Sequence, residues 1–281
     1  MEFSVLMSVY DRESPSHLAL SLESLAAQTM PANEIVLVKD GPLTGELEQT
    51  IRSFERALPV VTVDLPAHRG LGAALRAGVE HCRFDWFARM DSDDVCLPHR
   101  FERQIDFLKE HPEVDVLGTS ISEFENDHTR RQALRILPQE HRAVLAFAKF
   151  RNPLNHMTVM CRKRAVIAAG NYQERTGFED YDLWVRMLLG GSRFHNLPEA
   201  LVLARCGSGM QQRRGSARYA RREIALFWCF RKWGFLTRFE FLRSVMLRAP
   251  LRVLPAELRS RIYRSFLRRP VSALKTGERA N

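Results

Sequence analysis

Residues 1–120 alternate between short apolar runs and segments whose apolar positions recur with helical spacing. The apolar runs predict buried strands at residues 3–9, 34–38, 60–63, 86–90 and 114–117. The intervening segments predict amphipathic helices at residues 16–28, 44–57, 71–82 and 98–110, with Pro98 in the first turn of the last one. Strands that alternate with helices of this length are typical of parallel βαβ units. The pattern therefore predicts an α/β fold built on a Rossmann-like, doubly wound and mostly parallel sheet.

Beyond residue 120 the pattern is less regular. Residues 122–150 contain a polar stretch, 123–132, and an apolar run, 143–147, and no topology is predicted for them. A strand-like run at residues 159–161 follows, and a helix is predicted at residues 180–189. No internal repeat stands out.

Charge divides the chain into two parts. Residues 1–210 carry 24 Lys and Arg against 29 Asp and Glu, whereas residues 211–281 carry 18 against 4. We therefore predict a catalytic-type α/β domain at residues 1–210 and a basic, helical C-terminal extension at residues 211–281. So uneven a distribution indicates an anionic partner for the extension.

The extension also has an amphipathic pattern. Leu258, Ile262 and Phe266 follow Pro255 at helical spacing, and most of the nearby arginines lie off that line. Upstream, an apolar set is interleaved with basic residues: Phe235, Phe239, Leu242, Met246 and Leu247 among Arg238, Arg243 and Arg248. This arrangement is typical of a helix that lies on an anionic membrane surface. The alternative is a helical extension that packs on the sheet.

The five cysteines are widely spread and include no Cys-x-x-Cys pair, which argues against a disulfide framework or a thiolate zinc site. The N-terminus has no signal-peptide pattern, and no apolar stretch is long enough to span a bilayer. With the basic extension, these features predict a cytoplasmic protein at the inner face of the cytoplasmic membrane.

Polar residues follow each of the first four predicted strands. They are Tyr10-Asp11-Arg12, Lys39-Asp40-Gly41, His68-Arg69-Gly70 and Asp91-Ser92-Asp93-Asp94. In an open α/β sheet, ligands bind beyond the carboxyl ends of the strands, so these residues are expected at one edge of the sheet. The glycines Gly70 and Gly72 do not complete a dinucleotide fingerprint, because Leu75 stands where Gly or Ala is needed.

Asp91-Ser92-Asp93-Asp94 is the sharpest local signal. Three carboxylates within four residues repel one another unless a cation lies among them, and hard oxygen ligands suit Mg²⁺ or Mn²⁺. Asp91 and Asp93 can face one ion, since alternate residues of an extended segment point the same way. The simpler interpretation is that Asp93 or Asp94 caps the following helix. An EF-hand is excluded because Cys96 stands where the loop needs glycine.

Two further segments carry candidate chemistry. His156 lies in Asn152-Pro153-Leu154-Asn155-His156, just before the strand-like run. Glu179 and Asp180 open the predicted helix in Gly177-Phe178-Glu179-Asp180-Tyr181-Asp182-Leu183-Trp184. Acids in a first helical turn are commonly only partners of the helix dipole, but a carboxylate at the end of a helix above the sheet is also well placed as a general base.

Taken in order over residues 3–205, these motifs resemble glycosyltransferase family 2, whose members have the GT-A fold. The resemblance is carried by Ser8-Val9-Tyr10, Val38-Lys39-Asp40-Gly41, His68-Arg69-Gly70-Leu71, Arg89-Met90-Asp91-Ser92-Asp93-Asp94 and the segment from Gly177 to Trp184. The chain is most similar to family members that build bacterial exopolysaccharide or lipopolysaccharide. The resemblance implies an inverting, metal-dependent transfer of a sugar from a nucleoside-diphosphate sugar, with UDP favoured, to an acceptor hydroxyl. The acceptor would be a glycan, such as a sugar on a polyprenyl diphosphate.

The resemblance also implies a role for each matching residue. Residues implied in donor nucleotide binding are Ser8, Tyr10, Glu13, Asp40, Arg69, Gly70 and Asp91. Asp93, with Asp91, would hold the Mg²⁺ or Mn²⁺ ion. Asp180 would be the general base, with Glu179 beside it. Residues expected to contact the acceptor or the diphosphate are His156, Asp94 and Trp184.

The chain departs from the family pattern at Lys39, Pro42 and His68, and it has no Gln-x-x-Arg-Trp motif, which favours one sugar per encounter. Two rival functions stay open. One is a relative that binds nucleotide sugars without turnover. The other is a nucleic-acid-binding protein, which rests only on the basic tail and leaves the acidic cluster unexplained. No nucleic-acid partner is therefore expected.

Overall fold

The computed structural model describes residues 1–206, 216–253 and 269–270. Its elements, in chain order, are β1 (Ser4–Val9), α1 (Pro15–Ala26), β2 (Glu34–Lys39), α2 (Gly45–Phe54), β3 (Val60–Asp64), α3 (Leu71–His81), β4 (Trp86–Arg89), β5 (Val95–Cys96), α4 (Arg100–Glu110), β6 (Val116–Phe124), β7 (Ala133–Arg135), α5 (His141–Ala148), the 3₁₀ turn η1 (His156–Thr158), β8 (Met160–Arg162), α6 (Lys163–Ala168), α7 (Glu179–Leu189), β9 (Phe194–Arg205), α9 (Ala217–Lys232), α10 (Arg238–Val253) and β10 (Arg269–Pro270). The strands and helices predicted before residue 111 are all present. Pro98 lies just ahead of its helix, which begins at Arg100.

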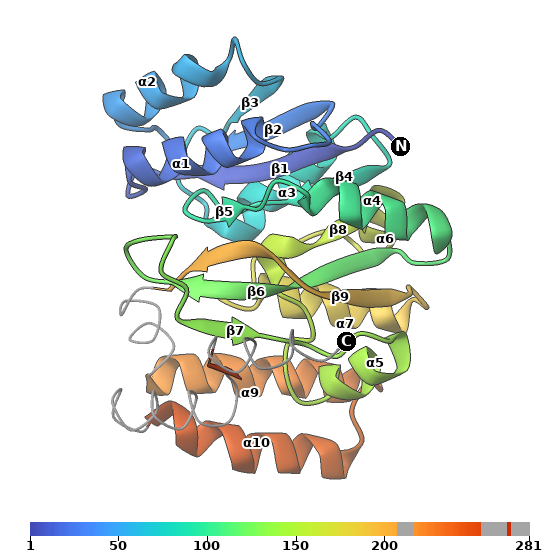
Figure 1. The fold of residues 1–281 in the computed structure, drawn as a ribbon. Helices are drawn as coiled ribbons and strands as arrows, with labels where there is room; N and C mark the ends of the chain where they lie inside the picture. Colours follow the sequence, from blue (N-terminus) through green and yellow to red (C-terminus); the bar gives the residue numbers. More distant parts are fainter. Residues whose placement is uncertain (207–215, 254–268, 271–281) are drawn as a thin grey trace.

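One mixed sheet runs through the molecule in the order β10-β7-β6-β8-β4-β1-β2-β3, with β9 alongside β6 and β5 paired to β9 (Figure 1). The pairs β1–β2, β2–β3 and β1–β4 are parallel, as the alternating pattern predicts. The chain moves outward from β1 to β3 and then returns to the other side of β1 as β4. The order of strands therefore reverses between β1 and β4, and that switch point is where open α/β sheets bind ligands.

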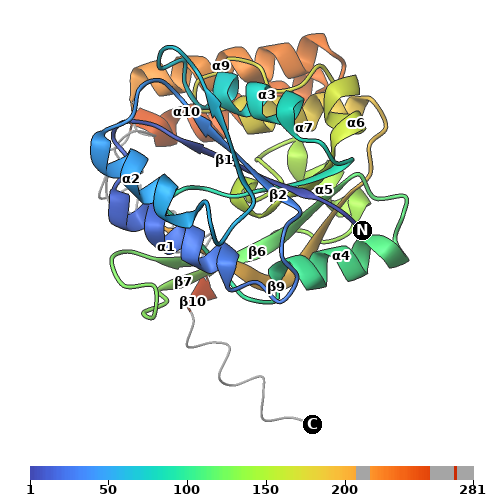
Figure 2. The same cartoon turned by 90° about the horizontal axis from the view of Figure 1, so that it is seen from above.

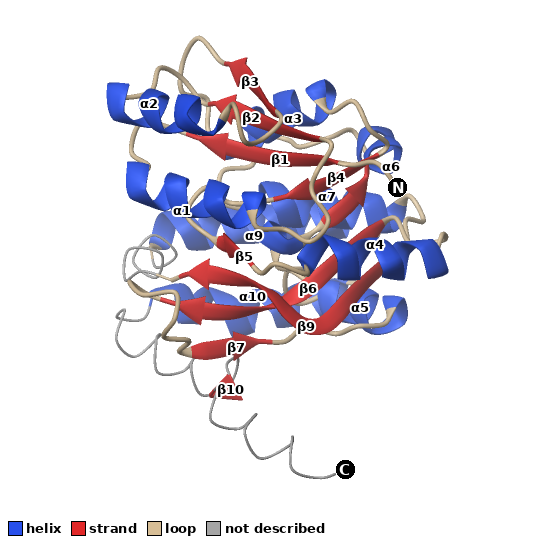
Figure 3. Ribbon diagram, turned by 45° about the horizontal axis from the view of Figure 1, so that its top comes forward, coloured by secondary structure: helices blue, strands red, loops and turns tan. Residues whose placement is uncertain are grey.

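Helices cover both faces of the sheet (Figures 2 and 3). Alternate residues of β1 face opposite ways: Leu6 packs in a cluster with α3, α7 and α9, whereas Val5 and Met7 pack in a second cluster with α1, α2 and α4. This alternation follows from the twofold period of a strand. Because both faces are covered, the run is continuously apolar rather than alternating.

The second half of the sheet differs from the first, because β8 pairs antiparallel with both β4 and β6. Strand β6 extends to Phe124, well into the segment for which the sequence predicts no topology, and all nine of its residues are buried. Its polar residues interrupt the apolar run by which a buried strand is recognised in a sequence. Thr119, for example, is held by hydrogen bonds from its N–H to Thr158 Oγ1 and to its carbonyl from Asn155 Nδ2.

Strand β9 was not predicted, and its sequence explains why. Pro198 interrupts it, and the register shifts where Leu197 pairs with Thr119 and Ala200 pairs with Ser120. Proline is tolerated in a strand at such a bulge, since the ladder hydrogen bond is already lost there.

Helix α9 packs on α7: the Tyr181 ring lies 5.0 Å from Phe230 and 6.1 Å from Phe227, centroid to centroid. Leu226, Phe227 and Phe230 are buried in the same cluster as α7. Helix α10 lies beyond α9 (Figure 1). The amphipathic helix predicted from Pro255 to Phe266 lies outside the described residues. Within the described residues, no helix is long and apolar enough to cross a membrane.

Candidate active site

The loop after β4 brings three carboxylates together. One oxygen each of Asp91, Asp93 and Asp94 lies within 4.8 Å of the others. Asp94 does not cap α4, whose N-cap is His99. Instead, Asp94 Oδ1 accepts a hydrogen bond of 2.7 Å from the backbone N–H of Arg205, at the end of β9. The interpretation that Asp93 or Asp94 caps this helix is therefore wrong, and the three carboxylates form a cluster that could hold a metal ion.

The loop is fixed from two sides. Arg205 Nε donates to the carbonyl oxygen of Asp93, and the same guanidinium lies 4.6 Å from the Phe124 ring centroid. On the other side, Ser92 Oγ donates to Glu13 Oε2 at 2.6 Å, which connects the loop after β4 to the loop after β1. These contacts hold the loop in place without using the carboxylate oxygens of Asp93.

The three carboxylates of this cluster repel one another. Burial, with the nearby charges of Asp91 and Glu13, raises the pKa of Asp93 to about 7. Burial, with the charges of Asp91 and Asp93, also raises the pKa of Asp94 well above its ordinary value. Asp94 Oδ2 is buried without a hydrogen-bond partner. A divalent cation among the three carboxylates would remove the repulsion and give that oxygen a partner, so the donor set fits Mg²⁺ or Mn²⁺.

The turn after β3 is organised by the aspartate after β2. Asp40 is buried, and its two oxygens accept backbone N–H bonds from Arg69 at 2.7 Å and Gly70 at 2.9 Å. Gly41 has φ +89°, and a Cβ there would lie 2.6 Å from the backbone nitrogen of His68, so only glycine allows this close approach. Asp40 thus shapes the predicted nucleotide pocket, whatever contact it makes with a nucleotide.

Other residues predicted to bind the donor lie around the same edge. The Tyr10 ring stacks on His68 with centroids 5.6 Å apart and an interplanar angle of 29°. Arg69 Nη2 pairs with Glu174 Oε1 at 2.8 Å, on the exposed surface. Ser8 is half-buried near the end of β1. The structure therefore gathers the ends of β1, β2 and β4 and the turn after β3, as the sequence predicts.

The predicted base lies at the start of α7. Asp180 Oδ2 accepts a hydrogen bond of 2.5 Å from Asn152 Nδ2, and Asp180 Oδ1 accepts one from the Tyr181 N–H. Glu179 is more deeply buried, and its Oε2 accepts from the Gly177 N–H at 2.8 Å. Burial, with the charge of Asp180, raises the pKa of Glu179 to about 7. Asn152 was part of a segment singled out in the sequence, but nothing there indicated its hydrogen bond to Asp180.

His156 and Trp184 lie beside each other between these two groups of acids. His156 Nε2 is 2.9 Å from the Tyr172 hydroxyl oxygen, and its ring meets Trp184 edge-on with centroids 5.9 Å apart. Burial and the charge of Arg89 hold the pKa of His156 well below its usual range, so the ring is neutral. Trp184 has no exposed surface and belongs to the core. The expectation that Trp184 contacts acceptor or diphosphate is therefore corrected: it packs behind His156.

Arg89 connects the two halves of the site, although no role was predicted for it from the sequence. It is the last residue of β4, with only 3 % of its side chain exposed, and it forms an ion pair with Asp91. Its charge lowers the pKa values of Asp93, Glu179 and His156, so all three lie within its electrostatic range. The Asp91–Asp94 cluster and the start of α7 therefore both feel the charge of this buried arginine. An arginine within a buried apolar strand was the available signal, because such a charge requires a partner.

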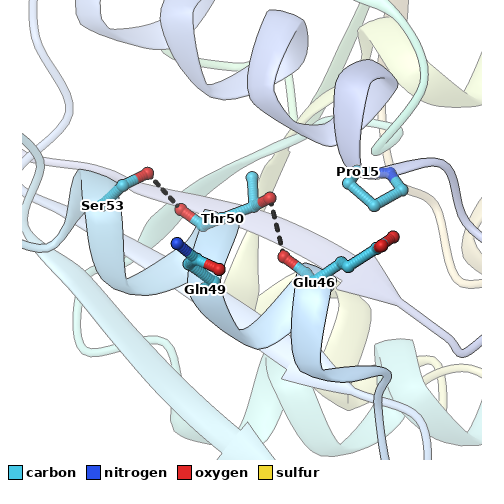
Figure 4. A pocket seen from close by; sticks show the side chains of 5 residues that line it. All are labelled: Pro15, Glu46, Gln49, Thr50 and Ser53. Carbon is cyan, nitrogen blue, oxygen red and sulfur yellow. Dashed lines mark hydrogen bonds between the residues drawn. The ribbon is translucent and has the colours of Figure 1, made fainter.

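A pocket of about 400 Å³ lies elsewhere, between the start of α1 and the exposed side of α2 (Figure 4). Its lining residues are Pro15, Glu46, Gln49, Thr50 and Ser53. The hydroxyls of Thr50 and Ser53 donate to backbone carbonyls of α2 itself. None of the converging carboxylates lines this pocket, so we assign it no part in the site.

The sequence model for glycosyl transferase family 2 matches residues 4–173. This chain is a member of that family. It is 41% identical over 90% of its length to the amylovoran biosynthesis glycosyltransferase AmsE of Erwinia amylovora, of which it covers 96%. It is 32% identical over 95% of its length to the Escherichia coli UDP-Gal:alpha-D-GlcNAc-diphosphoundecaprenol beta-1,3-galactosyltransferase, of which it covers 97%.

Among solved structures, the chain is similar to the mannosyltransferase PcManGT of Pyrobaculum calidifontis in complex with GDP-Man and Mn²⁺, with a TM-score of 0.65 and 14% identity. That match covers 99% of this chain and 79% of the other. At this identity the similarity concerns the fold, and it confirms the predicted GT-A architecture. The family match confirms that the protein is a glycosyltransferase.

Proposed function

We propose that this glycosyltransferase moves a sugar from a UDP-sugar, with inversion at the anomeric carbon, onto a sugar hydroxyl of a polyprenyl-diphosphate-linked acceptor in surface polysaccharide biosynthesis. The names of the two curated relatives support the pathway, the uridine donor and the lipid-linked acceptor. The observation that carries the mechanism is the joint position of two acidic groups. Asp93 and Glu179, the neighbour of Asp180, both lie within range of the Arg89 charge.

In this proposal the donor lies across the switch point between β1 and β4. Tyr10 and Glu13 border the base, and Asp40 and the turn it shapes, with Arg69 and Gly70, border the ribose and phosphates. Ser8 lies beneath the base at the end of β1. Asp91 and Asp93, with the unpartnered Asp94 Oδ2, would hold Mg²⁺ or Mn²⁺. When bound, such an ion stabilises the negative charge that develops on the departing nucleoside diphosphate.

The chemical step is a single displacement. Asp180 accepts the proton of the acceptor hydroxyl while that oxygen forms a bond to the anomeric carbon, and the bond from this carbon to the diphosphate oxygen breaks. We assign this role to Asp180 rather than Glu179, because Glu179 is more deeply buried and is bonded to the backbone of Gly177. Asn152 orients the Asp180 carboxylate. His156, neutral and bonded to Tyr172, faces the same region and is proposed to contact acceptor or diphosphate.

The test is to incubate the protein with Mn²⁺, a lipid-linked acceptor and a panel of nucleotide sugars, and to measure release of nucleoside diphosphate. Asp180→Asn should lower turnover by about 10²- to 10⁴-fold, the usual contribution of a general base, and leave the Kd of the donor unchanged. Asp93→Asn should remove both Mn²⁺-dependent donor binding and turnover. Asp106→Asn, at an exposed aspartate of α4, is the matched control.

Three results would reject the proposal. They are activity that persists in excess chelator, an Asp180→Asn variant that loses donor affinity as strongly as turnover, and donor binding by the unaltered protein without any transfer.

A further inference from the structure

The exposed apolar side chains of the described residues are concentrated on the C-terminal helices. Eleven large hydrophobic residues are exposed, and six of them lie between residues 228 and 247. The four most exposed are all on α10: Phe239 at 71 %, Met246 at 69 %, Leu247 at 62 % and Leu242 at 55 %. Exposed hydrophobic residues are normal when scattered singly, but a contiguous group marks an interaction surface.

These four residues share one face of α10. Taking Phe239 as the first, the others follow at i+3, i+7 and i+8, which places them on one side of a helix. Figure 1 shows α10 as the outermost helix, beyond α9. The opposite side of α10 is fixed to the body of the protein: Arg248 donates to the carbonyl oxygen of Phe150 and pairs with Glu223, and Lys149 pairs with Glu240. The helix is therefore held in place with its apolar face outward.

Trp228 of α9 is a further exposed apolar side chain beside α10. It is half exposed, its ring meets Phe241 of α10 with centroids 5.7 Å apart, and Lys232 lies 5.9 Å from the indole centroid. Tryptophan beside a lysine is a common pair at the boundary between headgroups and hydrocarbon. We call Trp228, Phe239, Leu242, Met246 and Leu247 the α9–α10 apolar face.

The charge around this face has one sign. Residues 216–253 contain nine Lys and Arg and two Glu, and both glutamates are bound internally, Glu223 to Arg248 and Glu240 to Lys149. Among residues 216–248, whose side chains the structure describes, the exposed charged ones are all basic: Arg218, Arg221, Arg222, Lys232 and Arg238. An exposed apolar face on a segment whose exposed charges are all basic complements a surface that is hydrocarbon within and anionic outside.

We propose that the α9–α10 apolar face docks on an anionic phospholipid membrane, with Phe239, Leu242, Met246 and Leu247 inserted and the surrounding arginines at the headgroups. This inference rests in part on the proposed function, because it gives the enzyme access to a lipid-linked acceptor. The connection to the site is direct: Tyr219 of α9 lies 4.7 Å from the Phe178 ring, centroid to centroid, and Phe178 is the N-cap of the helix that begins with Glu179 and Asp180. Helix α9 therefore connects the docked helix α10 to the segment that carries the proposed base.

The experiment is flotation of the full chain with vesicles of phosphatidylcholine alone or of phosphatidylcholine mixed with phosphatidylglycerol. We expect binding to the mixed vesicles, and we expect high salt to weaken it. The double variant Phe239→Gln/Met246→Gln should reduce the partition coefficient by about tenfold or more, because two large apolar side chains leave the interface. Lys232→Gln/Arg238→Gln should reduce binding to the mixed vesicles and leave binding to phosphatidylcholine alone unchanged.

The matched control is Val61→Gln/Ile167→Gln, which alters two apolar residues that are each 44 % exposed on β3 and α6. It should partition like the unaltered protein. Binding that does not depend on Phe239 and Met246, or no binding at all, would overturn the proposal. A concentration-dependent dimer that the double variant abolishes, without any vesicle binding, would assign the face to a second copy of the chain instead. Hydrolysis of the nucleotide sugar in solution should be unchanged in the double variant, so failure of membrane docking is distinguishable from failure of the transferase proposal.

Discussion

The guanidinium of Arg89 forms an ion pair with Asp91 from an almost fully buried position at the end of β4. Two of its nitrogens, Nε and Nη1, have no hydrogen-bond partner among the described residues. A buried cation is costly unless it is compensated, and here the compensation comes from the surrounding carboxylates. Arg89 therefore balances the negative charge of both acidic groups of the site, although it lies beneath them rather than at the surface.

We predict that Arg89→Gln shifts the acid limb of the pH profile of kcat/KM toward higher pH. The charge of Arg89 lowers the pKa values of Asp93 and Glu179, so its removal should leave both carboxyls protonated to a higher pH. The variant should also lose about 3–5 kcal/mol of stability, the usual cost of breaking a buried ion pair.

Arg89→Lys is the control, because it keeps the charge while losing the forked geometry. Its acid limb should stay where it is in the unaltered enzyme. An equal shift in both variants would show that packing, not charge, is responsible.

The affinity for Mn²⁺ should depend on pH because of Asp93. Its pKa is about 7 without metal, and the carboxyl must lose its proton to bind the ion. Below pH 7 the Kd for Mn²⁺ should rise by about tenfold per pH unit, and above it the Kd should level off. Titration calorimetry at several pH values measures this directly, and a Kd that does not change between pH 5.5 and pH 8 would contradict the assignment of Asp93 as a ligand.

The same groups set a pH dependence of stability in the metal-free protein. In the folded state the pKa of Asp93 rises from its ordinary value of 3.8 to about 7, and the pKa of Glu179 rises from 4.5 to about 7. Between those values the unfolded chain binds fewer protons than the folded one, so stability should fall as the pH rises from about 4 to 7 and stay level above it. Thermal unfolding in chelator should show this trend. Saturating Mn²⁺ should remove most of the pH dependence of stability that is due to Asp93.

The sequence allowed some of this site to be predicted for a specific reason. Asp91, Asp93 and Asp94 are adjacent in the chain, so their proximity needs no knowledge of the fold, and the alternation of strands and helices places Tyr10 and Asp40 at the same edge. The contacts that fix these residues come from distant segments. Arg205 donates a hydrogen bond to Asp94 from β9, a strand that is hard to predict because Pro198 interrupts its pattern. Asn152 donates a hydrogen bond to Asp180 from a loop whose sequence has no periodicity. Hydrogen bonds between such segments depend on tertiary packing and leave no local pattern.

Asn152 is expected to act through Asp180. Asn152→Ala removes the 2.5 Å hydrogen bond to Asp180 Oδ2, and kcat should fall by about 10- to 100-fold, the range for a hydrogen bond to a charged group. Asn152→Asp is a close isostere that keeps the acceptor for the Leu154 N–H but replaces the donor with a second carboxylate. It should lower kcat at least as much and raise the pKa of the base. The KM for the donor should be unchanged in both, and if only the donor KM changed, Asn152 would belong to the donor pocket.

A glycine of α3 tests whether the start of α7 must stay close to the sheet. A Cβ on Gly72 would lie 2.6 Å from the backbone oxygen of Gln173 and 3.4 Å from Glu179 Cβ, so Gly72→Ala must push α3 away from the segment that carries the proposed base. We expect a loss of about 1–3 kcal/mol of stability, as for an overpacked core, and a fall in kcat. Gly45→Ala is the matched control, since a Cβ there meets nothing within 4 Å at the start of α2. Alanine is the better helix former by up to about 1 kcal/mol, so this control should be neutral or slightly more stable, with kcat unchanged. Equal effects of the two substitutions on kcat would mean that the close contact between α3 and α7 has no part in positioning Asp180.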